Sequence, residues 1–363
     1  MKRLWHTYAS VIGPNRFLGA FLLALSVKGV LFIGLLQRFR NAMFPGYWGG
    51  FTFDSASYID PVEHLLANGA YLPDYRMPGF AVPYWCLRQL FDKAQALNAY
   101  LLLQLLMGAL SVVLLARIAF HITRAVAAFH VVFWLFAIST FVSLYDVLPL
   151  TESLTSSVII IAVYLLLRGT SSGKAWHLAA AGLFFTWAAF LRPVMLPLLV
   201  FGMLAVLLRS APWRWERRRA ALAFLLPFLL IETAWILRNH AVHERVVPLS
   251  TSWMMPDFLG SPTYRMCEVV QAFGGSLVWW DPQAEIRAFN IKDVGEAEHL
   301  RSPAHPPVIP AYAATPGFPM DSLQALARTV ERWNMAASDP ALRASEGRRI
   351  LETGALYIAT YKA

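Results

Sequence analysis

Residues 97–116, LNAYLLLQLLMGALSVVLLA, form a run of 20 residues without a charged side chain. In a helix that rises 1.5 Å per residue, about 20 apolar residues cover the roughly 30 Å hydrocarbon core of a bilayer. Six further apolar runs lie at 17–36, 126–145, 152–167, 177–191, 194–208 and 220–237. The sequence therefore predicts an all-α integral membrane protein with about seven transmembrane helices.

The composition is typical of an integral membrane protein. Of the 363 residues 57% are hydrophobic and 15% are charged, whereas soluble domains carry about 25% charge. The formal net charge of +9 is uneven, because residues 1–238 hold 20 Lys and Arg against 9 acids, and residues 239–363 hold 11 against 13. We expect a transmembrane module at 1–238 and an extracytoplasmic region at 239–363, and we exclude a disordered protein.

Positively charged residues are unequally shared between the two sides that this topology defines. Twelve Lys and Arg fall in four connections, which are 1–16, 117–125, 168–176 and 209–219. The connections on the other side are longer in total and hold six. Because an excess of Lys and Arg marks the cytoplasmic side, we expect a cytoplasmic N-terminus and an extracytoplasmic C-terminal region. This parity requires Arg192-Pro193 to separate two spans.

The connection at 37–96 is too long for a simple loop and is expected to carry function. It contains FDSASYIDPVEHLLANGAYLPDYRMPGFAVPYW, in which an amphipathic stretch at 55–68 precedes a Pro-Gly turn. Amphipathic helices of this kind lie on membrane surfaces. The acid Asp54 stands before this stretch and the cation Arg76 follows it, so opposite charges meet in one outer loop.

The order of these features resembles the first outer loop of the GT-C glycosyltransferase superfamily: an acid after the first membrane helix, a Tyr four residues later, an amphipathic helix ending in N-G-x-Y, and R-x-P-G-F. The resemblance continues in PLTESL around Glu152 and in FLRPV around Arg192. AWILRNHAVHERVVPLST at 234–251 is similar to the family's aromatic-x-x-R-N ending of the seventh helix. The resemblance covers residues 1–251. Protein-mannosyltransferase-like and aminoarabinose-transferase-like members use polyprenyl-phosphate sugars.

This resemblance implies a glycosyltransferase of a bacterial inner (plasma) membrane that needs no cofactor. It would move a hexosyl or pentosyl group from a polyprenyl-phosphate-linked donor to a hydroxyl of a lipid, glycan or protein acceptor on the extracytoplasmic face. Asp54 matches the family's catalytic acid and would be the base of an inverting transfer, an effect worth about 10²–10⁴ in rate. Arg76 aligns with the basic residue before the family's proline turn and would bind the donor phosphate.

The leaving phosphate is already a stable anion, so such a site needs cations more than a strong general acid. The other substrate-binding residues that we expect are Tyr58, Glu152, Arg192, Arg238 and Asn239. Simpler interpretations stand beside these roles. Asp54 has the position of a helix N-cap, Arg76 that of a headgroup contact, and Glu152 that of an acid favoured at a helix N-terminus.

Three polar side chains inside the predicted spans need partners. Lys28 lies near the middle of the first span, which is costly unless it is paired or reaches water. Gln104 is expected to form hydrogen bonds between helices. Glu232 lies two turns before Arg238 and is expected to pair with it or with Arg192.

Two other functions stay open. One is a non-catalytic flippase for lipid-linked glycans, or a membrane scaffold, whose arginines bind a lipid phosphate without chemistry. The other is an O-antigen polymerase-like enzyme. Charges gathered at one face, and not along a path through the membrane, favour transfer over flipping. GT-C proteins usually continue with further helices where this chain ends at GALYIATYKA, so we expect a truncated, minimal or inactive member.

The sequence does not predict binding of metal or nucleic acid, nor a disulfide. His240-x-x-His243-Glu244 leaves two metal ligands undefined. No zinc knuckle or aromatic RNA-binding signature occurs. Cys86 and Cys267 are the two cysteines, and we expect free thiols.

Overall fold

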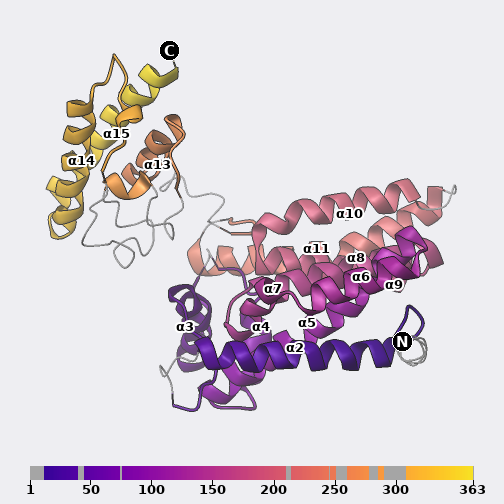
Figure 1. Cartoon of the computed structure of the whole chain (residues 1–363). Coiled ribbons are helices and arrows are strands. Elements are labelled where there is room, and N and C mark those ends of the chain that lie inside the picture. Colours follow the sequence, from indigo (N-terminus) through magenta and orange to yellow (C-terminus); the bar gives the residue numbers. More distant parts are fainter. Residues whose placement is uncertain are drawn as a thin grey trace. The chain divides into compact units, whose positions relative to one another are not determined.

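The computed structural model describes residues 12–39, 45–73, 76–209, 214–244, 246–250, 260–277, 285–289 and 308–362. Within these residues the chain forms 13 α-helices and no β-strand (Figure 1). It divides into two compact units, Met1–Trp253 and Met254–Ala363. The expected cytoplasmic N-terminal segment up to residue 11, and the tail at 290–307, lie outside the described residues.

The described part of the first unit contains ten helices, several of which lie alongside one another (Figure 1). They are α2 (Phe17–Phe39), α3 (Phe53–Asn68), α4 (Ala81–Arg88), α5 (Lys93–Thr123), α6 (Val126–Ala137), α7 (Thr140–Leu144), α8 (Glu152–Ser172), α9 (Ala175–Leu191), α10 (Leu196–Arg209) and α11 (Arg214–His243). The first unit is therefore an all-helical bundle, as the apolar runs predict.

Four helices are long and apolar enough to cross a membrane: α2, α5, α8 and the part of α11 from Glu216 to His243. The bent pair of α6 and α7 makes a fifth if it counts as one span. Several long apolar helices of this kind indicate a multi-pass membrane protein. At 17 and 14 residues α9 and α10 are shorter, so the predicted count of seven spans stays a prediction.

Two helix breaks shape the bundle. The predicted run at 126–145 is not one straight helix, because α6 ends at Ala137 and the chain bends by 42° before continuing in α7. Ser139 caps the new helix by accepting a hydrogen bond from the Val142 N–H. The second break, at Arg192-Pro193, lies where the sequence predicts it: α9 ends at Leu191 and a short 3-10 turn leads into α10.

A buried ion pair joins α2 to the segment before α8. Lys28 Nζ lies 3.1 Å from Asp146 Oδ2, and the two side chains are 0% and 1% exposed. Lys28 also donates to Ser143 Oγ at 3.0 Å, and the Ser153 hydroxyl donates to the other oxygen of Asp146. Lys28, which would be costly in a membrane span without a partner, is therefore paired within the protein.

Two amides of α5 fix the neighbouring loops. Gln104, which is fully buried, donates to three main-chain carbonyls within residues 145–148. It is hydrogen-bonded as expected, but its partners lie in the 3-10 turn before α8 and in the loop after that turn, and not on another long helix. Asn98 accepts from the Trp48 N–H and donates to the Gly46 carbonyl. Both loops therefore meet the same end of the bundle, where α5 begins.

The second unit has its own apolar core. Its helices are α13 (Pro262–Ala272), α14 (Met320–Met335) and α15 (Pro340–Lys362). They bury residues such as Val269, Leu326 and Tyr357, and the Tyr357 hydroxyl donates to the Ala313 carbonyl. Cys86 and Cys267 are free thiols, as expected.

We predict that Lys28→Met lowers the free energy of unfolding by about 3–5 kcal/mol, because it leaves the Asp146 carboxylate buried without its counter-ion. Thermal unfolding of the purified protein in detergent measures the effect. Lys174→Met, which removes an exposed lysine, is the control and should change little. The double variant Lys28→Met/Asp146→Asn should regain part of the loss. A Lys28→Met protein that melts like the wild type would contradict the role of this pair.

Candidate functional site

The candidate site lies at the end of the first unit where α8 begins and where α9 and α11 end. The chain between α3 and α4 packs directly on this end. A side chain at Gly79 would overlap the backbone of Phe190 and Leu191, and the Trp187 indole N–H donates to the Gly79 carbonyl at 2.9 Å. The R-x-P-G-F turn therefore needs its glycine to pack against the end of α9.

The first helical turn of α3 presents Asp54. Thr52 is the N-cap, and its capping box with Ser55 satisfies the first main-chain groups, so the interpretation of Asp54 as the N-cap is wrong. The carboxylate at Asp54 stands in the first turn, where the helix dipole favours a negative charge. Its side chain is 70% exposed and can be approached from solvent.

Arg76 connects the two residues that the sequence places on one face of α3. Its guanidinium lies 3.2 Å from Asp54 Oδ1 and donates to the Tyr58 hydroxyl at 2.8 Å. The guanidinium carbon also lies 4.3 Å from the centre of the Tyr58 ring. Since residues four apart on a helix are neighbours, one arginine reaches both. The Tyr71 hydroxyl holds the Arg76 main chain through its carbonyl at 3.0 Å.

A second ion pair stands beside the first. Glu152 begins α8, as the sequence predicts, and its Oε1 lies 3.1 Å from the Arg192 guanidinium at the end of α9. Its other carboxylate oxygen is buried without a hydrogen-bond partner. The Tyr58 hydroxyl lies 3.4 Å from Thr151 Oγ1, next to Glu152 in the chain. The two ion pairs are thereby joined into one network.

A cavity of about 340 Å³ opens beside this second pair. Its polar lining includes Glu152, Arg192, Ser153 and Ser156, and its apolar lining includes Met195. The carboxylate and the guanidinium can form hydrogen bonds with hydroxyls of a ligand, whereas Ser153 donates to Asp146 and Ser156 donates to the Ser153 carbonyl. The sequence motifs identify Glu152 and Arg192, but they do not identify the two serines, which lie on the same helix as Glu152.

Arg238 and Asn239 lie together near the end of α11. Arg238 donates to Asn239 Oδ1 at 2.6 Å and to the Pro73 carbonyl at 3.1 Å. Its guanidinium carbon lies 4.9 Å from the centre of the Trp235 ring. Asn239 is fully buried and donates to the Val247 carbonyl, so it holds Arg238 in place from within the protein.

The ion pair expected for Glu232 is not observed. Among the described residues the Glu232 carboxylate forms no ion pair with Arg238 or Arg192. Its Oε1 accepts the Leu249 N–H at 2.7 Å, and the Trp235 indole N–H donates to the carbonyl of the same Leu249. Glu232 therefore anchors the chain that follows α11, and the arginines keep their other partners.

An apolar cavity of about 290 Å³ adjoins Arg238. Its lining residues are Leu65, Tyr71, Pro78, Ala81, Val82, Trp85, Trp235 and Arg238. Seven of these are apolar or aromatic, and Arg238 supplies the one formal charge of the lining. The aromatic members were not predicted as site residues, although Tyr71 and Trp235 stand in the quoted N-G-x-Y and aromatic-x-x-R-N motifs.

The seven residues proposed from the sequence therefore lie at one end of one unit. Asp54, Tyr58 and Arg76 form one group, which Thr151 joins to the pair of Glu152 and Arg192. Arg238 and Asn239 reach this network through Tyr71, because Arg238 lies 5.5 Å from the Tyr71 ring. Across the described residues no three His, Cys, Asp or Glu side chains lie close enough to hold a metal ion.

No protein-family model, curated protein or solved structure matches the chain. The likeness to the GT-C superfamily therefore rests on the motifs quoted above.

An ion pair behind the site holds α3 against α4. Arg88 donates from Nε to Glu63 Oε1 at 2.8 Å and from Nη2 to Oε2 at 3.0 Å, and the Tyr84 hydroxyl donates to Oε1 at 2.7 Å. Burial by itself raises the pKa of Glu63, but these hydrogen bonds outweigh it and hold the pKa below its ordinary value of 4.5. The ionised carboxylate therefore stabilises the fold.

We predict that Glu63→Gln lowers the free energy of unfolding by about 1–3 kcal/mol at neutral pH. Because the pKa of Glu63 is lower in the folded protein, its contribution is complete above the unfolded value and is lost as the pH falls through the folded value. The variant and the wild type should therefore converge in melting temperature under acid conditions. Asp60→Asn, an exposed change on the same helix, is the control. A difference that does not depend on pH would contradict the assignment.

Proposed function

We propose that the chain is a membrane glycosyltransferase that moves a sugar from a polyprenyl-phosphate-linked donor to an acceptor hydroxyl on the extracytoplasmic face, with inversion. The observation that carries this proposal is the joined network of Asp54, Arg76, Glu152 and Arg192 at one end of a membrane bundle, next to an apolar cavity that ends at Arg238. A lipid phosphate needs both an apolar cavity and cations.

The apolar cavity suits the prenyl chain of the donor. Leu65, Val82, Trp85 and Trp235 line it, and Arg238 stands beside them. Burial of hydrocarbon contributes about 0.8 kcal/mol for each CH₂, so a few isoprene units suffice for useful affinity. With the prenyl chain held in this cavity, the donor phosphate lies at Arg238. A guanidinium group can bind two phosphate oxygens at once.

Arg76 couples phosphate binding to the activation of the base. In the structure its guanidinium is shared between Asp54 and Tyr58. When Arg76 turns to a donor phosphate, Asp54 loses its ion-pair partner, and its carboxylate can turn to the acceptor hydroxyl. Arg76 therefore releases the base only when a donor sugar is bound.

The transfer then proceeds in one displacement. The acceptor oxygen attacks the anomeric carbon opposite the phosphate and gives its proton to Asp54. The bond from the anomeric carbon to the phosphate oxygen breaks, and the electron pair leaves with the phosphate, whose charge Arg76 and Arg238 stabilise. Glu152 and Arg192, in the neighbouring cavity, hold hydroxyls of the sugar or of the acceptor. Attack from the opposite side inverts the sugar.

The orientation belongs to the same proposal. We place the N-terminus in the cytoplasm of a bacterial cell and count seven spans, with α9 and α10 as a short hairpin around Arg192. Tilted neighbours and local thinning accommodate helices shorter than the bilayer. The site and the second unit are then extracytoplasmic. This arrangement is favoured by the arginines at the opposite end, which fit the positive-inside rule.

We predict that Asp54→Asn lowers the rate of sugar transfer about 10²–10⁴-fold, because the amide keeps the shape of the side chain but accepts no proton. Membranes that contain the protein, incubated with radiolabelled polyprenyl-phosphate sugars and extracted acceptors, measure transfer. Asp60→Asn on the same helix should keep wild-type activity. Wild-type turnover by a normally expressed Asp54→Asn protein would reject Asp54 as the base. Donor binding without transfer by the wild type would instead favour a flippase or scaffold.

We predict that a reporter fused after residue 362 is extracytoplasmic and that one inserted at 173, between α8 and α9, is cytoplasmic. Alkaline phosphatase and green fluorescent protein fusions distinguish the two sides, because the first is active only outside the cytoplasm and the second is fluorescent only within it. A cytoplasmic reading after residue 362 would mean that α9 and α10 do not form two spans.

A further inference from the structure

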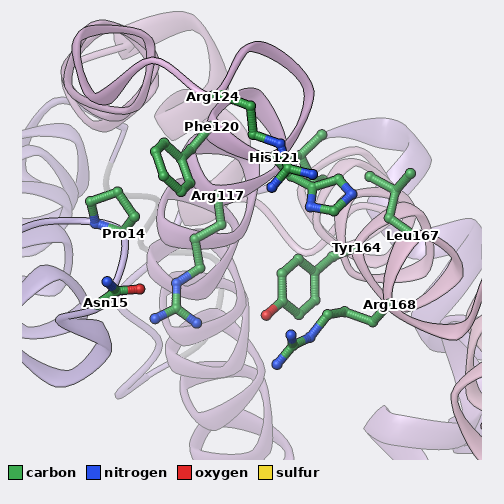
Figure 2. A pocket seen from close by; sticks show the side chains of 10 residues that line it. Pro14, Asn15, Arg117, Phe120, His121, Arg124, Tyr164, Leu167 and Arg168 are labelled. Carbon is green, nitrogen blue, oxygen red and sulfur yellow. The ribbon is translucent and has the colours of Figure 1, made fainter. Parts of the chain in front are cut away.

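A basic cavity lies at the opposite end of the first unit from the candidate site. It has a volume of about 310 Å³ and is formed by the residues before α2 and by the last turns of α5 and α8 (Figure 2). Its lining residues are Pro14, Asn15, Arg117, Ile118, Phe120, His121, Arg124, Tyr164, Leu167 and Arg168. The proposed transfer reaction uses none of them.

The charge of this cavity is of one sign. Arg117, Arg124 and Arg168 line it, and no acid is among the lining residues. In the described part of the chain no carboxylate lies within ion-pair distance of any of the three. At the other end of the bundle, in contrast, Arg76 and Arg192 are each paired with an acid. Acids of the described residues therefore do not neutralise the positive charge of the basic cavity, and an anionic ligand can do so.

Two of the arginines are oriented by aromatic rings. The guanidinium carbon of Arg117 lies 5.0 Å from the centre of the Phe17 ring, and that of Arg168 lies 5.9 Å from the Tyr164 ring. Figure 2 shows both guanidinium groups and the Tyr164 hydroxyl directed toward the same space. Arg117 Nε is buried and has no hydrogen-bond partner. A buried, unpartnered donor is costly, and a ligand with acceptor oxygens would satisfy donors of this group.

The cavity lies close to the ends of α5 and α8. Arg117 comes six residues before the end of α5 and Arg168 four residues before the end of α8, so they lie about 9 Å and 6 Å inside these helix ends. Leu18 on α2 and Ile122 on α5 are 68% and 69% exposed and offer apolar surface to acyl chains beside the cavity. Arginines at this depth meet phosphates of the headgroup layer.

We propose that this cavity binds the phosphate of an anionic membrane phospholipid. Arg117 and Arg168 bind the phosphate oxygens, which guanidinium groups match in geometry and charge. Tyr164 and Asn15 form hydrogen bonds with the glycerol part of the headgroup. No lining carboxylate is present to attract the ammonium of a zwitterionic lipid or to hold the Mg²⁺ that accompanies a nucleotide. The site therefore selects lipids with a net negative charge.

The proposal goes beyond the general preference of cytoplasmic ends for positive charge. Arg217, Arg218 and Arg219, at the start of α11, are exposed at the same end of the bundle and line no part of this cavity. The orientation rule treats these arginines and the cavity arginines alike. A selective lipid site requires the cavity arginines alone, which gives a matched pair of variants.

The test is native mass spectrometry of the full-length protein in detergent, titrated with phosphatidylglycerol or with phosphatidylcholine. We expect the first phosphatidylglycerol to bind at least tenfold more tightly than the first phosphatidylcholine. Arg168→Gln, at an exposed position, should weaken that first binding about tenfold, as the loss of a charge-assisted hydrogen bond predicts. Arg117→Gln should do the same, and Arg218→Gln should leave it unchanged.

A second measurement keeps the test decisive if a variant folds poorly. Phosphatidylglycerol with a photoreactive group near its headgroup, crosslinked to the wild type, should label peptides that contain residues 117–124 and 164–168. Equal binding of the two lipids, equal weakening by Arg218→Gln, or labels elsewhere would overturn the proposal. Displacement of the lipid by millimolar glycerol phosphate would also overturn it, because it would show a site for a soluble phosphate.

Discussion

The buried ion pair of Lys28 and Asp146 is the constraint on which the end of the bundle that carries the candidate site depends. Both charges are removed from water, so each is tolerated only while the other stays in place. The pair fixes α2 against the turn before α8, and Ser153 ties that turn to the first residues of α8. The start of α8 in turn sets the positions of Thr151 and Glu152. A charge pair outside the site thus determines where the site's acid stands.

Arginines serve different purposes at the two ends of the same bundle. At the end that carries the candidate site, Arg76 and Arg192 are paired with acids of the protein itself, which keeps the two guanidinium groups oriented. At the opposite end, aromatic rings orient Arg117 and Arg168, and among the described residues no carboxylate forms an ion pair with either arginine. Rings hold a guanidinium without cancelling its charge. The first arrangement suits a ligand that comes and goes, and the second suits one that is always at hand in the bilayer.

The sequence predicts the parts of this fold that depend on local pattern. Apolar runs locate the helices, the start of α8 at Glu152 is correct, and Arg192-Pro193 separates α9 from α10. The sequence does not predict the bend between α6 and α7, because a capping serine there competes with an apolar run that alone favours one helix. It also misses the partner of Lys28, which lies 118 residues away. Partners at such separations depend on how helices pack, which hydropathy does not encode.

The candidate site shows the same division. Motif spacing brings Asp54 and Tyr58 to one face of α3, but the bridge from Tyr58 to Thr151 appears only once α3 lies against the start of α8. The position of Arg238 has a similar origin. Tyr71 holds the main chain of Arg76 by a hydrogen bond and offers its ring to Arg238, so one residue sets the spacing of two cations. This arrangement arises because the chain that follows α3 packs against the end of α11, where Arg238 also donates to the Pro73 carbonyl, and the spacing of residues within a motif does not encode such packing.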